Sequence, residues 1–203
     1  MSPDKLKAAA LISFVVSILL LLGGGYFAKD RVPPYPGKVV DPEGKVLFQK
    51  SDIIDGQSVY QRYGLMDHGS VWGHGSQRGM EFSATTLRIL GDSIRNDLAN
   101  REYGKPYEAL KGLEKEIIDL KTTREVKENR YDAAQDTLTL TAAQVSALMP
   151  LSQFWEKTFK EGQKRYGFLP DTIQSPEERL QIARFFFWTA WAASTNRPGK
   201  DYT

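Results

Sequence analysis

The hydrophobic and polar positions divide the chain into an apolar N-terminal stretch and a longer part with helical patterns. Residues 8–28 contain no charged side chain. As a helix, this stretch would span about 31 Å, close to the hydrocarbon thickness of a bilayer. Lys5 and Lys7 precede it. We therefore predict that residues 1–31 form a short tail and a single-pass transmembrane helix that inserts into the lipid bilayer.

Two other interpretations share this composition: a cleaved signal peptide and a buried helix of a soluble domain. A cleavage site needs small residues at alternate positions, which Gly23 and Gly25 provide but Tyr26 does not. Positive charge flanks both ends of the apolar stretch. The short basic tail favours a cytoplasmic N-terminus and places the main domain on the other side of the membrane.

The rest of the chain is predicted to be mainly α-helical. Prolines at positions 33, 34 and 36 fix extended geometry, so residues 32–52 are expected to form an extended stalk. A domain should follow over residues 53–203. Apolar spacing and capping residues predict its helices at 53–63, from 83, at 106–127, from 141 to a kink or end at Pro150, a further helix that ends near 167, and a last one at 176–194. Thr141 and Gln144 form a capping box, and Ser175 before Pro176 marks the start of the last helix.

The middle of this domain carries a charged helical insertion, at about residues 100–135. Leu110, Leu113, Ile117 and Leu120 recur at a spacing of 3-4-3, with charged residues on the other faces. This pattern predicts the core side of an amphipathic helix. A coiled-coil seam with a partner remains an alternative, although two heptads are too few to support it.

Composition limits the function classes. The 27 basic and 25 acidic residues give a net charge of +2, which provides no electrostatic basis for nucleic-acid binding. Cysteine is absent. That absence excludes disulfides, thiolate metal sites, a cysteine nucleophile and thioether attachment of haem.

No residue is assigned a catalytic, cofactor-binding or metal-binding role. His68 and His74 are the only histidines, and a metal site usually needs three or four defined ligands. We expect them to hydrogen-bond within their glycine-rich loop. Glu177 and Glu178 lie in the first turn of a proline-started helix, where the helix dipole favours acidic residues.

The order of a helix, a glycine-rich loop, a long middle and an amphipathic last helix resembles that of c-type cytochromes. In that family the loop carries CxxCH. One alignment here places Leu65 and His68 at the cysteine positions, and another places Gly64 and Asp67 there. Leu169 precedes Pro170 where such cytochromes have a methionine ligand. The resemblance therefore implies a cytochrome c fold that has lost its haem.

Two strings are more specific: GLMDHGSVWGHGSQRG at 64–79 and FFFWTAWAASTNRPGKDYT at 185–203. They resemble the N-terminal region of quinol-dependent nitric oxide reductases, of the haem-copper oxidase superfamily, and the similarity extends over essentially the whole chain. In that family a membrane helix and a haem-free cytochrome c-like domain precede the catalytic multi-helix membrane part. The resemblance implies a bacterial inner-membrane protein of denitrification, with its main domain in the periplasm.

The resemblance also implies where the chemistry takes place. The full-length family enzyme reduces two NO to N2O with haem b, haem b3 and non-haem iron, whose ligands lie on later membrane helices. None of those ligands corresponds to a position in this chain, so whether the chain is itself an enzyme stays open. We expect a structural and docking region that is not redox-active, with the catalytic membrane part fused downstream.

Two alternatives belong to other classes. One is a membrane-tethered periplasmic electron carrier that binds haem non-covalently, with His68 or His74 and Met66 or Met80 as ligands. The other is a generic anchored periplasmic scaffold.

A cytochrome without haem must fill a large apolar space. Trp72, Met80 and Phe82 are the predicted fillers, and Trp72→Ala is then expected to cost about 3–5 kcal/mol. The last helix is apolar nearly all round over residues 185–191. One face is predicted to be core, and the other, with Trp188 and Trp191, to contact the membrane part or the bilayer interface. Simple core packing of the whole helix is the alternative.

Overall fold

The computed structural model describes residues 2–29 and 32–203, and the chain divides into two units at the bond between Pro34 and Tyr35. The first unit contains helix α1 (Pro3–Lys29), which is long and apolar enough to cross a membrane. The predicted apolar helix is therefore confirmed. Its predicted boundary at residue 31 lies outside the described residues.

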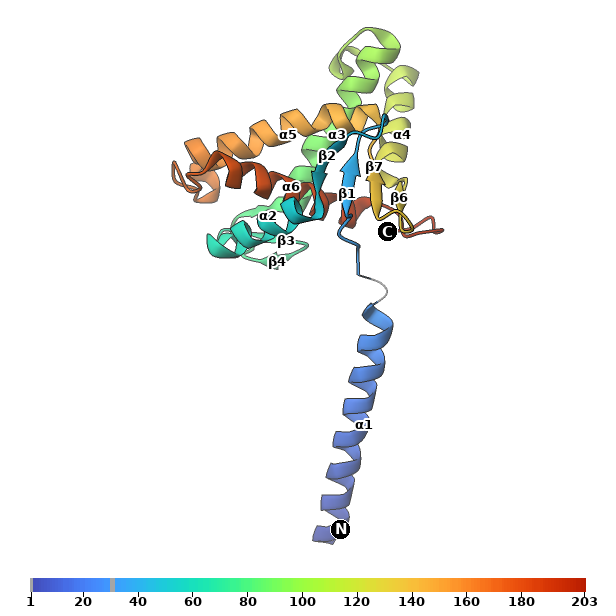
Figure 1. Ribbon diagram of the computed structural model, residues 1–203, viewed down its shortest axis with the longest axis vertical. Helices are drawn as coiled ribbons and strands as arrows, with labels where there is room; N and C mark the ends of the chain where they lie inside the picture. The colour runs from blue at the N-terminus through green and yellow to red at the C-terminus, as the bar shows by residue number, and fades with distance from the viewer. Residues whose placement is uncertain (1, 30–31) are drawn as a thin grey trace. The chain divides into compact units, whose positions relative to one another are not determined.

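The second unit is mainly helical, as predicted (Figure 1). Its helical elements are of two kinds: longer α-helices, which form the body, and short 3-10 turns between them. The α-helices are α2 (Lys50–Arg62), α3 (Phe82–Tyr103), α4 (Leu113–Lys127), α5 (Ala142–Glu161) and α6 (Pro176–Ser194). The 3-10 turns are η1 (Leu65–Asp67), η2 (Tyr107–Ala109) and η3 (Lys164–Tyr166).

A four-stranded sheet of order β2-β1-β7-β6 lies beside the helices. Its strands are β1 (Lys38–Val40), β2 (Val46–Gln49), β6 (Tyr131–Asp132) and β7 (Thr137–Thr139), with β1 and β7 parallel and the other pairs antiparallel. The predicted stalk at 32–52 is therefore wrong for most of its length. The segment is extended only up to Gln49, where α2 follows, and it is paired into the sheet: β1 lies between β2 and β7. Val39 and Phe48 are buried in the main core, and the Phe48 ring packs against Phe187 of α6.

The glycine-rich loop also contains a sheet, of order β4-β3-β5. Its strands are β3 (Gly69–Val71), β4 (His74–Gly75) and β5 (Met80–Glu81). Close backbone approach explains one of the glycines, since a Cβ at Gly79 would overlap the carbonyl oxygen of His68. The loop is thus a tightly packed structure before α3.

Helix α6 lies at the centre of the domain, with α2, α3 and α5 packed against it (Figure 1). The predicted break at Pro150 does not occur, and α5 is continuous from Ala142 to Glu161. Pro150 and Ser146 are both exposed, so the Ser146 carbonyl that loses its helical partner can bond to water. The Thr141–Gln144 capping box that was predicted at the start of α5 is present.

The C-terminal half of α3 and the N-terminal part of α4 form a helical hairpin that projects from the body, and the C-terminal end of α4 packs against the main core through Val126 (Figure 1). The predicted core stripe on α4 is wrong, because Leu113 and Leu120 are about 70% exposed. Instead of starting at 106, the helix begins at Leu113, after the η2 turn and a left-handed Gly112. Helix α4 buries Ile118 and Thr122 instead. Of the predicted stripe, Leu110 is buried, but it lies before α4 and packs with Ala99 and Ile118.

Candidate functional site

Aromatic rings fill the interior between the glycine-rich loop and helices α3, α5 and α6. We call the following fully buried side chains the aromatic cluster: Phe82, Trp155, Phe159, Phe168 and Phe186. Phe82 and Phe186 stack with centroids 4.7 Å apart and planes 6° from parallel. Trp155 lies 4.7 Å from Phe186, and Phe159 lies 5.3 Å from Phe168. The rings therefore form one continuous contact network.

The rings of the cluster come from α3, α5, α6 and the segment that follows α5. Phe82 is the first residue of α3, and Glu81 caps this helix by accepting a hydrogen bond from the Ala84 backbone N–H. Trp155 lies on the buried face of α5 and donates from Nε1 to Thr86 Oγ1 at 3.2 Å. This bond satisfies the one polar group of the indole ring and fixes the separation of α3 and α5.

The segment after α5 directs Phe168 inward and Leu169 outward. The backbone N–H of Gln163 donates to the Phe168 carbonyl at 2.9 Å, and the backbone N–H of Phe168 donates to the Gln163 carbonyl at 3.2 Å. Leu169, at the position expected for a methionine ligand, is 74% exposed. The neighbouring Phe168, which sequence reasoning missed, is the residue that reaches the interior.

The predicted fillers divide into two groups. Met80 and Phe82 are buried, as predicted. Trp72 is 45% exposed, so its prediction as a filler is wrong, and the large stability loss predicted for Trp72→Ala loses its basis. The reason is local: Trp72 and Gly73 form the turn between β3 and β4, which places the indole at the tip of a hairpin.

The two histidines do not form a common site. Both are exposed, and within residues 2–29 and 32–203 no group of three or more His, Asp or Glu side chains could hold a metal. The His68 ring lies 5.6 Å from Phe168, at the edge of the aromatic cluster. Neither imidazole has a hydrogen bond in the described part of the chain, unlike the loop bonding that we expected.

Helix α6 is buried on both faces inside the domain. Trp188 and Trp191 are buried, so their predicted outward orientation is wrong. Tyr35 stacks on Trp188 with centroids 4.0 Å apart, and Tyr131 lies 6.3 Å from Trp191. The second apolar face of α6 is therefore covered by the chain before β1 and by β6, two segments that no local pattern had indicated as its partners.

A buried arginine holds the segment between Phe168 and α6. Arg179 is almost fully buried; its Nη1 donates to the carbonyls of Ile173 and Gln174 at 2.6 and 2.7 Å, and its Nε donates to Glu156 at 2.7 Å. Sequence reasoning missed this residue. The signal was present, since Arg179 lies three residues before Ile182, on the buried face of α6.

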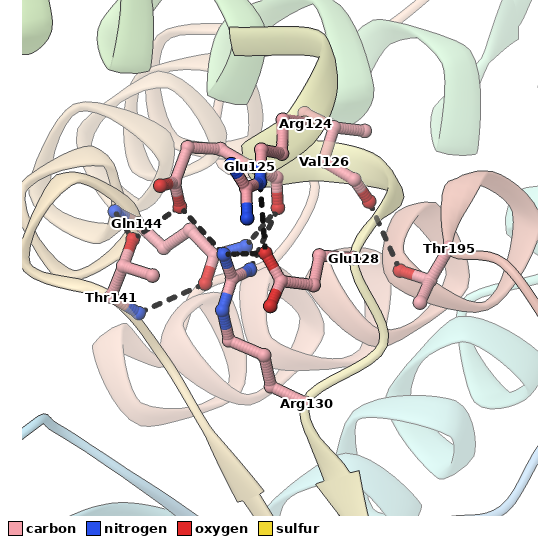
Figure 2. Close-up of polar contacts among 8 residues, drawn as sticks. All are labelled: Arg124, Glu125, Val126, Glu128, Arg130, Thr141, Gln144 and Thr195. Carbon is pink, nitrogen blue, oxygen red and sulfur yellow. Dashed lines mark hydrogen bonds and ion pairs between the residues drawn. The ribbon is translucent and has the colours of Figure 1, made fainter. Parts of the chain in front are cut away.

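Polar contacts hold α4, β6 and α5 together at the base of the hairpin (Figure 2). The Arg130 guanidinium lies between Glu125, at 3.4 Å, and Glu128, at 2.9 Å. Thr141 Oγ1 donates to the Glu125 carboxylate at 2.7 Å, and Gln144 Nε2 donates to the Glu125 carbonyl at 2.9 Å. The capping residues of α5 therefore also bind α4.

Tyr60 packs against Phe82 and Phe186 of the aromatic cluster. Burial raises the pKa of Tyr60, and the negative charges of Glu81 and Asp67 raise it further. The phenol is therefore neutral at physiological pH. Its hydroxyl has no hydrogen-bond partner among the described protein atoms.

These residues do not match what a c-type haem requires. The chain has no thiol for attachment, Leu169 offers no thioether and points to solvent, and Phe82, Phe168 and Phe186 occupy the interior beside the loop. A haem in this position would have to displace several fully buried rings, at a cost of several kcal/mol.

The fold and the site define a cytochrome c-like helical domain that follows a candidate membrane helix. Residues 36–203 match the family model described as the NorB cytochrome c-like domain of nitric oxide reductase, and the chain belongs to this family. No curated protein matches the chain. The matched region begins at Pro36, next to the division between the two structural units, so the family covers the folded domain with the sheet.

Proposed function

We propose that this chain is the structural and docking N-terminal region of a quinol-dependent nitric oxide reductase, and that it is not itself redox-active. The observation that supports the proposal is the aromatic cluster, whose buried rings fill the interior beside the glycine-rich loop, where a cytochrome c-like domain would hold its haem. Electrons would then pass from quinol to the catalytic membrane part without entering this domain.

The partner in this proposal is the catalytic multi-helix membrane part, fused downstream in the same polypeptide. Helix α1 would span the inner membrane once and keep the folded unit on the periplasmic side. The haems b and b3 and the non-haem iron of the family enzyme would belong entirely to that membrane part.

The proposal is tested by expressing the 203-residue chain alone and together with the membrane part. Alone, with a quinol donor and NO, the purified chain should give no turnover. Together, the two should co-elute after detergent extraction, and the membrane part should be less active without the chain. Turnover by the chain alone, or no association, would refute the proposal.

The non-covalent haem carrier is not favoured by any contact in the domain. Met80, one of its predicted ligands, is buried in the main core, whereas His68 and Met66 lie exposed on the surface. A carrier would require the aromatic cluster to open.

A further inference from the structure

The hairpin between β3 and β4 has a tryptophan at its tip in an unusual backbone conformation. Trp72 has a φ of 53°, and Gly73 follows with a φ of 76°. Two successive left-handed residues are typical of a tight two-residue turn, in which Asn or Gly normally takes the first position. A bulky aromatic residue there costs on the order of 1 kcal/mol or more. Folding alone would be served better by a glycine at position 72.

The rest of the domain holds this side chain in place. Trp72 Nε1 donates to the Thr189 carbonyl of α6 at 2.9 Å, and the indole lies 5.4 Å from Trp188. Trp188 in turn stacks on Tyr35 at 4.0 Å. Because its N–H bond points into the domain, the exposed part of Trp72 is mainly apolar ring surface. We call these three side chains the aromatic stack.

The aromatic stack begins at the residue where the folded unit starts. Tyr35 follows Lys29, the last residue of α1, by six positions, and a fully extended chain of that length spans at most about 21 Å. If α1 crosses a bilayer, covalent connectivity alone therefore limits how far Tyr35 can lie from the membrane surface.

The charges around the tip also suit a membrane surface. Residues 69–80 contain one charged side chain, the exposed and cationic Arg78, and no Asp or Glu. Tryptophan and tyrosine are the residues that prefer the boundary between lipid headgroups and acyl chains, and cationic groups favour anionic headgroups.

We propose that the tip of the β3–β4 hairpin inserts the exposed face of Trp72 into the headgroup region of the bilayer. This would be a second membrane contact, in addition to α1. The contact would restrict the orientation of the folded unit on the membrane. This inference rests on the proposed role of α1 as a membrane anchor. It assigns to Trp72 a lipid-binding role in place of the filler role that the sequence suggested.

The test uses intrinsic fluorescence, because the other three tryptophans, Trp155, Trp188 and Trp191, are buried. The full chain is reconstituted into vesicles of phosphatidylethanolamine and phosphatidylglycerol, with or without phosphatidylcholine brominated at the acyl chains. Bromine quenches only a nearby indole, so wild type should lose emission in the brominated vesicles. Trp72→Phe should lose less than half as much. The matched variant Trp191→Phe, which keeps Trp72, should lose at least as large a fraction as wild type.

Flotation of the same vesicles separates failure of this inference from failure of the anchor. If the chain floats with the vesicles but the brominated lipid quenches wild type and Trp72→Phe equally, or quenches neither, the inference is overturned and the tip faces solvent or a protein partner. If the chain does not float, the anchor is refuted and the inference with it. Equal thermal unfolding of wild type and Trp72→Phe would confirm that the variant is folded.

Discussion

The aromatic cluster and the α3–α4 hairpin are stabilised in opposite ways. The cluster consists of fully buried rings in contact with one another, at the centre of the main core. The hairpin has a separate small core of Ala99, Leu110 and Ile118. Around this small core lie polar pairs, such as Lys121 with Glu102 at 2.5 Å.

This difference indicates which part of the domain can accept substitutions without a large loss of stability. A cofactor-sized interior must be filled completely, because each void among close-packed rings costs stability. A projecting hairpin with its own small core can change its surface charges at little cost, since exposed ion pairs contribute about 0–1 kcal/mol. Substitutions in the two regions should therefore differ in effect, from a large loss in the cluster to small changes at the surface.

The largest effect is expected in the aromatic cluster. Phe186→Ala should lower the free energy of unfolding by about 3–5 kcal/mol, because it opens a void among fully buried rings. The matched truncation on the hairpin, Leu120→Ala, should change it by less than about 0.5 kcal/mol, since Leu120 is exposed. Urea unfolding of both variants measures the difference. Equal losses would refute the contrast.

A smaller loss is expected at the buried arginine. Arg179→Ala should cost about 2–3 kcal/mol, because it leaves the carbonyl of the fully buried Ile173 without a donor and removes the bond to the Gln174 carbonyl. Arg88, which is exposed and paired with Asp92 on the surface, provides the control. Arg88→Ala should have little effect on the urea midpoint. If Arg179→Ala were equally mild, the segment before α6 would not depend on this residue.

A loss of about 1 kcal/mol is expected at the base of the hairpin. Thr141→Ala removes the N-cap of α5 and the hydrogen bond to Glu125. Thr141→Ser should restore most of the stability, because serine also caps. Thr123→Ala on the exposed side of α4 should be nearly silent in the same thermal unfolding assay. A serine variant as unstable as alanine would exclude the capping explanation.

The smallest effect is a pH response at the sheet. The backbone of Gly37 and the Tyr131 hydroxyl hydrogen-bond Asp136 and lower its pKa. A lowered folded pKa contributes stability above the unfolded value of about 3.9, and this contribution is lost as pH falls through the folded pKa. Asp136→Asn should therefore lose less stability between pH 5 and pH 3 than wild type, by about a few tenths of a kcal/mol. Identical pH profiles in urea would contradict the assignment.

The sequence predicted the elements that depend on local signals. The Thr141–Gln144 box and the Ser175–Pro176 start gave the N-termini of α5 and α6 correctly. The apolar helix of the anchor and the mainly helical class followed from composition and periodicity. These features are local, so the residues that determine them are close in sequence.

The predictions that were wrong or missing concern contacts between segments that are distant in the sequence. Nothing near Val39 indicated that β1 would pair with β7, almost a hundred residues later. That pairing also places Tyr35 on Trp188, which is why Trp188 is buried rather than outward-facing. Trp72 was predicted as a filler from its size, whereas turn geometry decided its exposure. In the cluster, Phe82 was predicted, but Phe168 could be placed only once the Gln163 bridge was known.

The most direct test of the central claim is a haem titration of the purified chain. Haemin is added to the detergent-solubilised wild type and to Phe82→Ala/Phe186→Ala, in which the aromatic cluster is opened, and the Soret band and bound haem are measured after gel filtration. The account predicts no stoichiometric haem on wild type and no redox-linked change in its spectrum. One equivalent of haem retained by wild type, with a Soret band that shifts on reduction, would contradict it.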